Sequence, residues 1–133
     1  MKKRIAVLDG NGALCAHVRN LLGEADVEFL PLQASSPETA ALALAALRPL
    51  DALLFDCMGQ NGLGLATAAQ IRRDPDFTQL PLLASTALPL TPALSARFLA
   101  NNLIYLRRPF TRSDLETLLF GAVHIEESIE NFN

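Results

Sequence analysis

Tryptophan is absent from this chain of 133 residues, and tyrosine occurs only once. Aromatic residues make up 6% of the sequence although half of all residues are hydrophobic, so a core would consist mainly of Leu, Ala, Ile and Val. A chain of this length has room for one domain with one sizeable core. The composition therefore favours helices packed over a parallel sheet.

Clusters of basic residues are also scarce. The formal net charge is −3, and Arg72-Arg73 and Arg107-Arg108 are pairs rather than patches. Sequence-independent binding of nucleic acids requires several Lys or Arg side chains to neutralise the phosphates. We therefore expect no direct contact with nucleic acid.

Long hydrophobic runs and cysteine pairs are missing as well. No apolar run approaches the roughly 20 residues of a membrane-spanning helix, and only four apolar residues separate the basic start from Asp9, too few for a signal peptide. Cys15 and Cys57 are far apart and have no histidine at a metal-ligand spacing. We expect a soluble cytoplasmic protein with reduced thiols, without a zinc site and without membrane contact.

Apolar runs typical of strands alternate five times with helical patterns. The expected strands are residues 5–8, 27–30, 52–55, 82–85 and 104–106, and the expected helices are 13–22, 37–47, 65–73, 92–100 and 112–122. Strands joined by helices form right-handed crossovers and a parallel sheet covered on both faces. The sequence therefore predicts an α/β fold with a five-stranded, doubly wound parallel sheet in the flavodoxin-like order 2-1-3-4-5.

Several expected helices carry start signals. Ser36 and Thr91 each precede a proline, so that a hydroxyl can accept a backbone N–H while the proline needs no acceptor. Thr111 with Asp114 three residues later resembles a capping box, and Gly23 fits a helix exit. These signals predict where four of the helices begin or end.

Two carboxylates follow the runs expected to form the first and third strands. Asp9 comes directly after residues 4–8, and Asp56 ends the run 51–56. In the predicted order these strands are neighbours at the switch point, where the carboxyl ends of strands open into a ligand crevice. A carboxylate can attack a phosphoryl donor and become an acyl phosphate. Asp56 is therefore a candidate nucleophile with Asp9 beside it.

Three further residues stand downstream of Asp56: Gly64 eight residues later, Thr86 after 30 and Arg108, followed by Pro109, after 52. Together with the two aspartates they resemble the receiver domain of two-component response regulators, from about Ile5 to Leu119. The resemblance implies a receiver domain over residues 1–122, followed by a polar tail or the start of a linker at 123–133. It implies a signalling domain in a phosphorelay, not an enzyme, with Asp56 as the phosphoacceptor.

The resemblance also implies a Mg²⁺ site. Its ligands would be Asp9, Asp56 and the backbone carbonyl of Met58. Receivers usually have two adjacent acids after the first strand, but here Gly10 and Asn11 follow Asp9. Because Mg²⁺ takes hard oxygen ligands, the loss of one carboxylate should weaken its binding.

The remaining matches concern phosphoryl binding and switching. Thr86 corresponds to the hydroxyl residue that binds the phosphoryl oxygens, and Tyr105 to the aromatic switch residue. Arg108 stands where receivers have lysine, and the peptide bond before Pro109 is typically cis in that family. A planar guanidinium is no conservative replacement for an ammonium, so we expect altered geometry at this position.

As partners, the resemblance implies a histidine kinase or a phosphotransfer protein. The switch would act on the face built from the fourth helix, fifth strand and fifth helix, comprising residues 93–99, Tyr105 and 112–119. That face would contact an effector domain or a second copy of the chain.

Other functions stay open on the residues alone. Gly10, Arg108 and a loop without proline after Asp56 are compatible with a pseudo-receiver, an interaction module that works without phosphorylation. Residues 9–14 weakly resemble the first motif of haloacid dehalogenase-type phosphatases, but Asn11 stands where that motif has its general acid. A flavodoxin role is disfavoured because no phosphate loop follows the first strand and no Trp can stack on a flavin.

Overall fold

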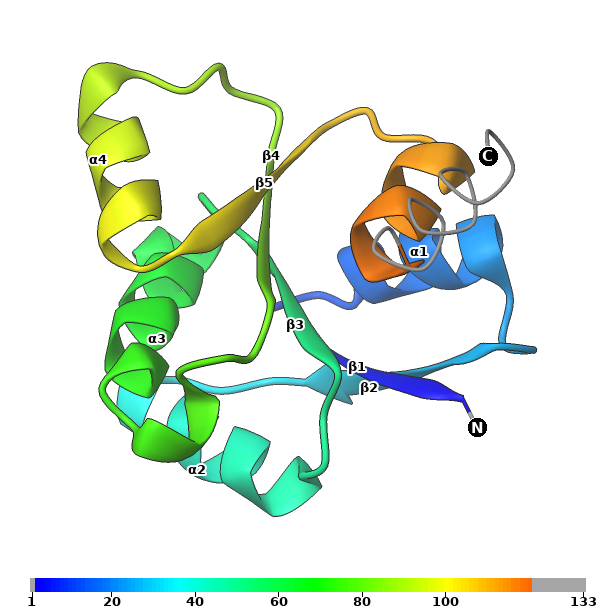
Figure 1. Cartoon of the computed structure of the whole chain (residues 1–133), viewed down its shortest axis with the longest axis horizontal. Helices are drawn as coiled ribbons and strands as arrows, with labels where there is room; N and C mark the ends of the chain where they lie inside the picture. Colours follow the sequence, from blue (N-terminus) through cyan, green and yellow to red (C-terminus); the bar gives the residue numbers. More distant parts are fainter. Residues whose placement is uncertain (1, 121–133) are drawn as a thin grey trace, which may run out of the picture.

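The computed structural model describes residues 2–120, in which strands and helices alternate along the chain (Figure 1). The strands are β1 Lys3–Leu8, β2 Val27–Leu32, β3 Ala52–Asp56, β4 Leu82–Thr86 and β5 Leu103–Arg107. The helices are α1 Ala13–Leu22, α2 Pro37–Leu47, α3 Leu63–Arg72 and α4 Pro92–Ala100, with short 3₁₀ turns η1 Gln60–Gly62 and η2 Pro75–Phe77. Residues 112–120 form a further helix after β5.

All five strands are parallel and lie in the order β2-β1-β3-β4-β5, which confirms the predicted fold and topology. Leu8 at the end of β1 lies beside Phe55 of β3, and Asp56 lies beside Ser85 of β4. In this register the strands end side by side, so their carboxyl ends share one edge of the sheet.

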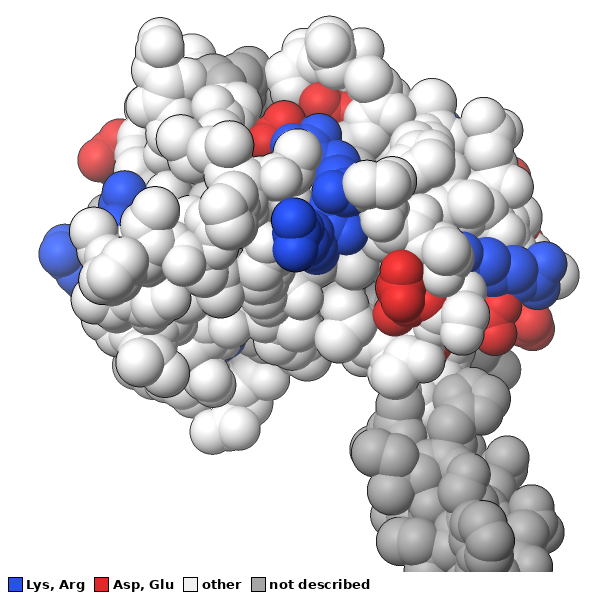
Figure 2. Space-filling model, turned by 90° about the horizontal axis from the view of Figure 1, so that it is seen from above, with Lys and Arg blue, Asp and Glu red and all other residues white. Residues whose placement is uncertain are grey.

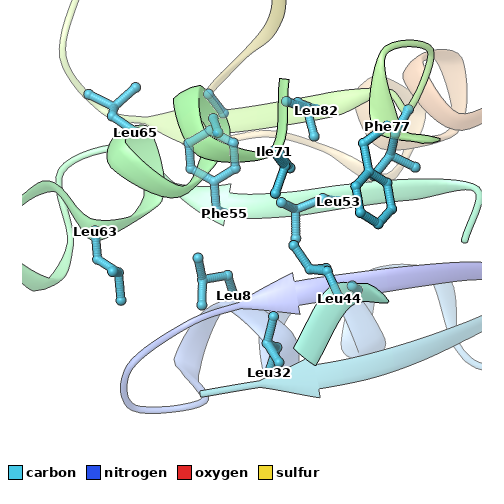
Figure 3. Close-up of a cluster of buried hydrophobic side chains, with 14 of the residues drawn as sticks. Leu8, Leu32, Leu44, Leu53, Phe55, Leu63, Leu65, Ile71, Phe77 and Leu82 are labelled. Carbon is cyan, nitrogen blue, oxygen red and sulfur yellow. The ribbon is translucent and has the colours of Figure 1, made fainter. Parts of the chain in front are cut away.

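Two apolar layers cover the sheet. Strand β3 supplies both of them, because its side chains alternate between the faces: Leu53 and Phe55 point into one layer, and Leu54 into the other. In Figure 1, α2, α3 and α4 lie on one side of the sheet and α1 and the helix at 112–120 on the other. Figure 3 shows the first layer, in which Phe55 and Leu53 lie among side chains of α3, β1 and β4. Burying a Leu or Phe side chain of this kind contributes about 1.5–3 kcal/mol.

The predicted helix start signals are confirmed. The hydroxyl of Ser36 accepts the amide of Thr39 at 3.2 Å, and that of Thr91 accepts the amide of Leu94 at 3.2 Å. Asp114 and Thr111 exchange hydrogen bonds of 3.1 and 2.8 Å between each backbone amide and the other side chain. Such caps satisfy amides that have no partner inside the helix.

Several element boundaries were predicted wrongly. β1 begins at Lys3 rather than at residue 5, and β2 continues through Pro31, which a strand at the edge of a sheet tolerates. α3 begins at Leu63 instead of residue 65 because Gly62, at φ +81°, turns the chain into the helix. The predicted end of the last helix and the tail at 123–133 lie outside the described residues.

Among residues 2–120, no helix has the length and apolar character needed to cross a bilayer.

Candidate functional site

Asp56 is the last residue of β3, and 29% of its side chain is exposed. Its Oδ1 accepts hydrogen bonds from the backbone amide of Met58 and from Nη2 of Arg108, both at 3.1 Å. Its second oxygen, Oδ2, makes no hydrogen bond to residues 2–120. One carboxylate oxygen is therefore held in place while the other is available to a ligand.

Asp9 follows β1 and points to the first turn of α1. Its Oδ2 accepts the amides of Leu14 and Cys15 at 2.6 and 3.2 Å. The residue at the N-cap position, Gly12, has a left-handed φ of +77° and no side chain with which to cap the helix. Asp9 thus supplies the missing acceptor and places its negative charge at the positive end of the helix.

Asp9 and Asp56 line the same open hollow, of about 270 Å³. Its walls also include Gly10, Asn11 and Gly59, together with Leu8 and Gly64. A Cβ atom on Gly59 would lie 3.2 Å from Oδ2 of Asp56, so the glycine leaves the carboxylate accessible. The two predicted carboxylates are therefore brought together in one solvent-reachable site at the carboxyl edge of the sheet.

Arg108 enters the site from the segment after β5. Its backbone amide donates to the carbonyl of Thr86 at 2.9 Å, which continues the ladder between β4 and β5. The side chain is 34% exposed and forms the ion pair with Asp56, while its Nε is buried without a hydrogen-bond partner in the described part of the chain. The bond between Arg108 and Pro109 is cis, as the resemblance implied.

Thr86 ends β4 at the same edge, but its side chain is buried, with 1% of the residue exposed. Its Oγ1 accepts the amide of Leu88 at 3.1 Å. The hydroxyl of Tyr105 donates to the carbonyl oxygen of the same Leu88 at 2.8 Å. Thr86 and Tyr105, the two predicted switch residues, therefore both bond to Leu88 in the loop after β4 rather than to Asp56.

The oxygen atoms of the hollow suit a weakly held Mg²⁺. Oδ2 of Asp56 and Oδ1 of Asp9 are hard donors of the kind that this cation prefers. The predicted third ligand, Met58, lines a second pocket formed with α3 and α4 instead of this hollow. The charge is low, since Gly10 adds no carboxylate and Asp9 has already committed one oxygen to α1. Within residues 2–120, no group of three or more His, Cys, Asp or Glu side chains is placed to hold a metal ion.

Cys57 lies next to Asp56 but is fully buried. Burial, and secondarily the negative charge of Asp56, raise the pKa of its thiol above the usual value. A reactive cysteine needs the thiolate form, so Cys57 is not a competing nucleophile.

The sequence did not reveal two features of this site. The capping of α1 by Asp9 depends on the path of the intervening loop, and the contact of Gly59 with Asp56 depends on the turn that leads into η1. For the contact of Gly59 with Asp56, the one local signal in the sequence is the glycine three residues after the candidate nucleophile.

The face of the molecule in Figure 2 is mostly uncharged. A few Lys and Arg side chains near its centre lie beside Asp or Glu side chains, and no broad basic patch covers this face.

No protein-family profile and no curated protein sequence matches the chain. Solved structures do match. The chemotaxis protein CheY4 of Vibrio cholerae superposes with a TM-score of 0.71 at 18% identity, covering 90% of this chain and 97% of that one. The chain has the fold of response regulator receiver domains.

Two further receiver structures are similar. The receiver domain of a sensor histidine kinase from Pseudomonas aeruginosa, described with a magnesium ion in its active-site cleft, is 22% identical, with 90% and 95% of the two chains covered and a TM-score of 0.68. The N-terminal domain of a response regulator receiver protein from Methanoculleus marisnigri is 26% identical, with 96% and 94% covered and a TM-score of 0.61. The receiver fold therefore extends over nearly the whole chain.

Proposed function

We propose that this domain is a receiver in two-component signalling, which accepts a phosphoryl group on Asp56 from a histidine kinase or a phosphotransfer protein. The observation that carries the proposal is the arrangement around one carboxylate. Oδ1 of Asp56 is fixed by Arg108, and Oδ2 faces a hollow shared with Asp9. This is an arrangement that an acyl-phosphate-forming carboxylate requires, with one oxygen oriented and the other exposed.

The chain's residues have distinct roles in this reaction. The amide of Met58 and the guanidinium of Arg108 orient the carboxylate of Asp56, and the guanidinium can also donate to the equatorial oxygens of an incoming phosphoryl group. Gly59 keeps the approach open. Mg²⁺, when held by Asp9, Asp56 and the Met58 carbonyl, would neutralise the phosphoryl oxygens.

The loop after β4 would carry the signal away from Asp56. A phosphoryl group adds charge and strong acceptor oxygens, which would accept the hydroxyl hydrogen of Thr86 and draw its side chain away from the amide of Leu88. Because Leu88 is also bonded to Tyr105, loss of the Thr86 contact changes the support of the loop that leads into α4. The face of α4, β5 and the helix at 112–120 would then bind an effector domain or a second copy differently.

The alternative is a pseudo-receiver that binds partners without phosphorylation, and Gly10 and Arg108 are the residues that favour it. A haloacid dehalogenase-type phosphatase is disfavoured further by the geometry. Asn11, in the general-acid position of that motif, accepts the amide of Ala13 at 2.9 Å and has no proton to give from that oxygen.

Intact-protein mass spectrometry after incubation with acetyl phosphate and Mg²⁺ tests the proposal. We expect a gain of one phosphoryl mass, which the Asp56→Asn variant loses while it keeps the fold. The Asp26→Asn variant, at an exposed aspartate on the loop before β2, is the matched control and should label like the wild type. Absence of labelling at saturating donor would overturn the proposal and leave the pseudo-receiver.

A further inference from the structure

The charges around Asp56 are arranged unusually for a site that handles a phosphoryl group. Two carboxylates, those of Asp9 and Asp56, line the hollow, and one guanidinium, that of Arg108, pairs with Asp56. Gly10 adds no charge, so the negative charge that would attract a divalent cation is small.

We propose that Arg108, in place of a divalent cation, stabilises the charge on the phosphoryl oxygens, so that Asp56 accepts a phosphoryl group without requiring Mg²⁺. This inference rests on the proposed function and specifies how its charge is neutralised. It concerns the lysine position of receivers, at which this chain has an arginine.

The contacts of Arg108 support this role. Nη2 already lies 3.1 Å from Oδ1 of Asp56, the oxygen next to the one that would bear the phosphoryl group. Nε is buried without a hydrogen-bond partner in residues 2–120, and such a donor gains from an added acceptor. A guanidinium offers two parallel N–H groups to phosphate oxygens, whereas an ammonium acts as a point charge.

The state of Asp9 lowers the demand for a cation. Its Oδ2 accepts two amides at the beginning of α1, whose positive end partly compensates its charge. Asp9 therefore repels an incoming phosphoryl group less than a free carboxylate would. With one acid replaced by Gly10 and the other bound to a helix end, the site needs less added positive charge, and the guanidinium of Arg108 supplies part of it.

The bonds, electrons and protons of the proposed step are accounted for without a metal ion. An oxygen of Asp56 forms a bond to the phosphorus of acetyl phosphate, and the bond from phosphorus to the bridging oxygen breaks. The electron pair of that bond leaves with acetate, and no proton is transferred. Arg108 stays protonated throughout and donates N–H groups to the equatorial oxygens as charge accumulates there.

The decisive experiment compares labelling by acetyl phosphate in Mg²⁺ and in EDTA for three proteins. In the wild type we expect EDTA to slow labelling by less than about tenfold, and in Arg108→Lys by at least about a hundredfold, the cost of losing an oriented donor. Arg107→Met, at the exposed neighbouring arginine, is the control and should behave like the wild type. Arg108→Lys keeps the charge, and its thermal unfolding reports whether the fold is intact.

Calorimetric titration of the unphosphorylated protein with Mg²⁺ provides a readout that does not involve the reaction. The wild type should bind Mg²⁺ weakly, and Gly10→Asp should bind it at least about tenfold more tightly, because added ligand charge raises the affinity of such sites. The ratio of the labelling rate in Mg²⁺ to the rate in EDTA should also be larger for Gly10→Asp than for the wild type.

The outcomes separate the two proposals. Labelling of the wild type that vanishes in EDTA, or equal EDTA sensitivity of the wild type and Arg108→Lys, would overturn the role of Arg108 while leaving Asp56 as acceptor. No labelling of the wild type under either condition would overturn both. Labelling in EDTA that depends on Arg108 would support both.

Discussion

Tyr105 donates its hydroxyl hydrogen to the carbonyl oxygen of Leu88 at 2.8 Å, although 17 residues separate them. The amide of the same Leu88 donates to Thr86 at 3.1 Å. The ring of Tyr105 is fixed in turn by an edge-on contact with Phe98 of α4, with 5.9 Å between the ring centroids. The loop after β4 is therefore held at one residue by a strand end on one side and by β5 on the other.

This arrangement predicts that Tyr105→Phe will loosen the loop without disturbing the core, because the ring contact with Phe98 is kept and only the hydroxyl is lost. The lost hydrogen bond is exposed to solvent, so the free energy of unfolding should fall by only about 0.5 kcal/mol. Hydrogen exchange at residues 87–91 should accelerate, while exchange in β1 and β3 should not. Unchanged exchange at Leu88 would show that Thr86 alone holds the loop.

Gly64 provides a second prediction, about the support beneath Asp56. A Cβ atom there would lie 2.5 Å from Cδ2 of Phe55 and 2.8 Å from the backbone oxygen of Asp56. The backbone cannot yield as a flexible side chain would, so Gly64→Ala should lower the free energy of unfolding by about 1–3 kcal/mol. Urea unfolding measures the change.

Gly59→Ala is the matched comparison for Gly64→Ala. Its added Cβ would meet only the carboxylate of Asp56, at 3.2 Å, and that side chain can shift. We expect little loss of stability but slower phosphoryl acceptance, because the oxygen facing the hollow is crowded. If Gly59→Ala proves the more destabilising of the two, the close contact of α3 with β3 is not the constraint described.

The convergence of Asp9 and Asp56 could be predicted from the sequence because it follows from topology. Both residues end apolar runs, and parallel strands joined by helices bring their carboxyl ends to one edge. The pairing of Asp56 with Arg108 across 52 residues required the resemblance to receivers, since no local pattern connects them. The capping of α1 by Asp9 was not predictable, because the hydrogen bond that Asp9 accepts from the amide of Leu14 depends on the left-handed turn at Gly12.

Arg72 shows the same limit in the scaffold. Its guanidinium donates to four backbone carbonyls, those of Phe77 and Thr78 near η2 and of Asn101 and Asn102 after α4. In the sequence it is one of two adjacent arginines at the end of a helix, and nothing local distinguishes it from Arg73. Only the packing of two chain segments around one side chain, at η2 and after α4, identifies it as a connection between α3 and α4.

The contacts of Arg72 predict that Arg72→Met will destabilise the protein whereas Arg73→Met will not. Methionine keeps the apolar stem but leaves four carbonyls without their donor, of which those of Asn101 and Phe77 are partly buried. We expect a loss of about 1–3 kcal/mol in the free energy of unfolding, measured by urea unfolding. Arg73 is exposed and provides the control. Equal effects of the two variants would mean that water replaces the guanidinium at little cost.

The buried thiols predict a dependence of stability on pH. Burial raises the pKa of Cys15 and of Cys57 above the value of an unfolded chain, about 8.5. Below that pH the thiols are neutral in both states, and their contribution is fully present. As pH rises past it, the unfolded thiols ionise first, which favours unfolding, so the stability contributed by the two residues is lost on the alkaline side.

Comparison of the wild type with Cys15→Ala/Cys57→Ala isolates this effect. Both proteins lose stability in alkali through other groups, but only the wild type should show the additional decrease that starts near pH 8.5. Urea unfolding under reducing conditions at neutral pH and at about pH 10 measures it, since the advantage of the wild type over the variant should shrink between the two. Parallel pH profiles would show that the folded thiols ionise as readily as those of the unfolded chain, and that Cys57 is accessible to solvent beside Asp56.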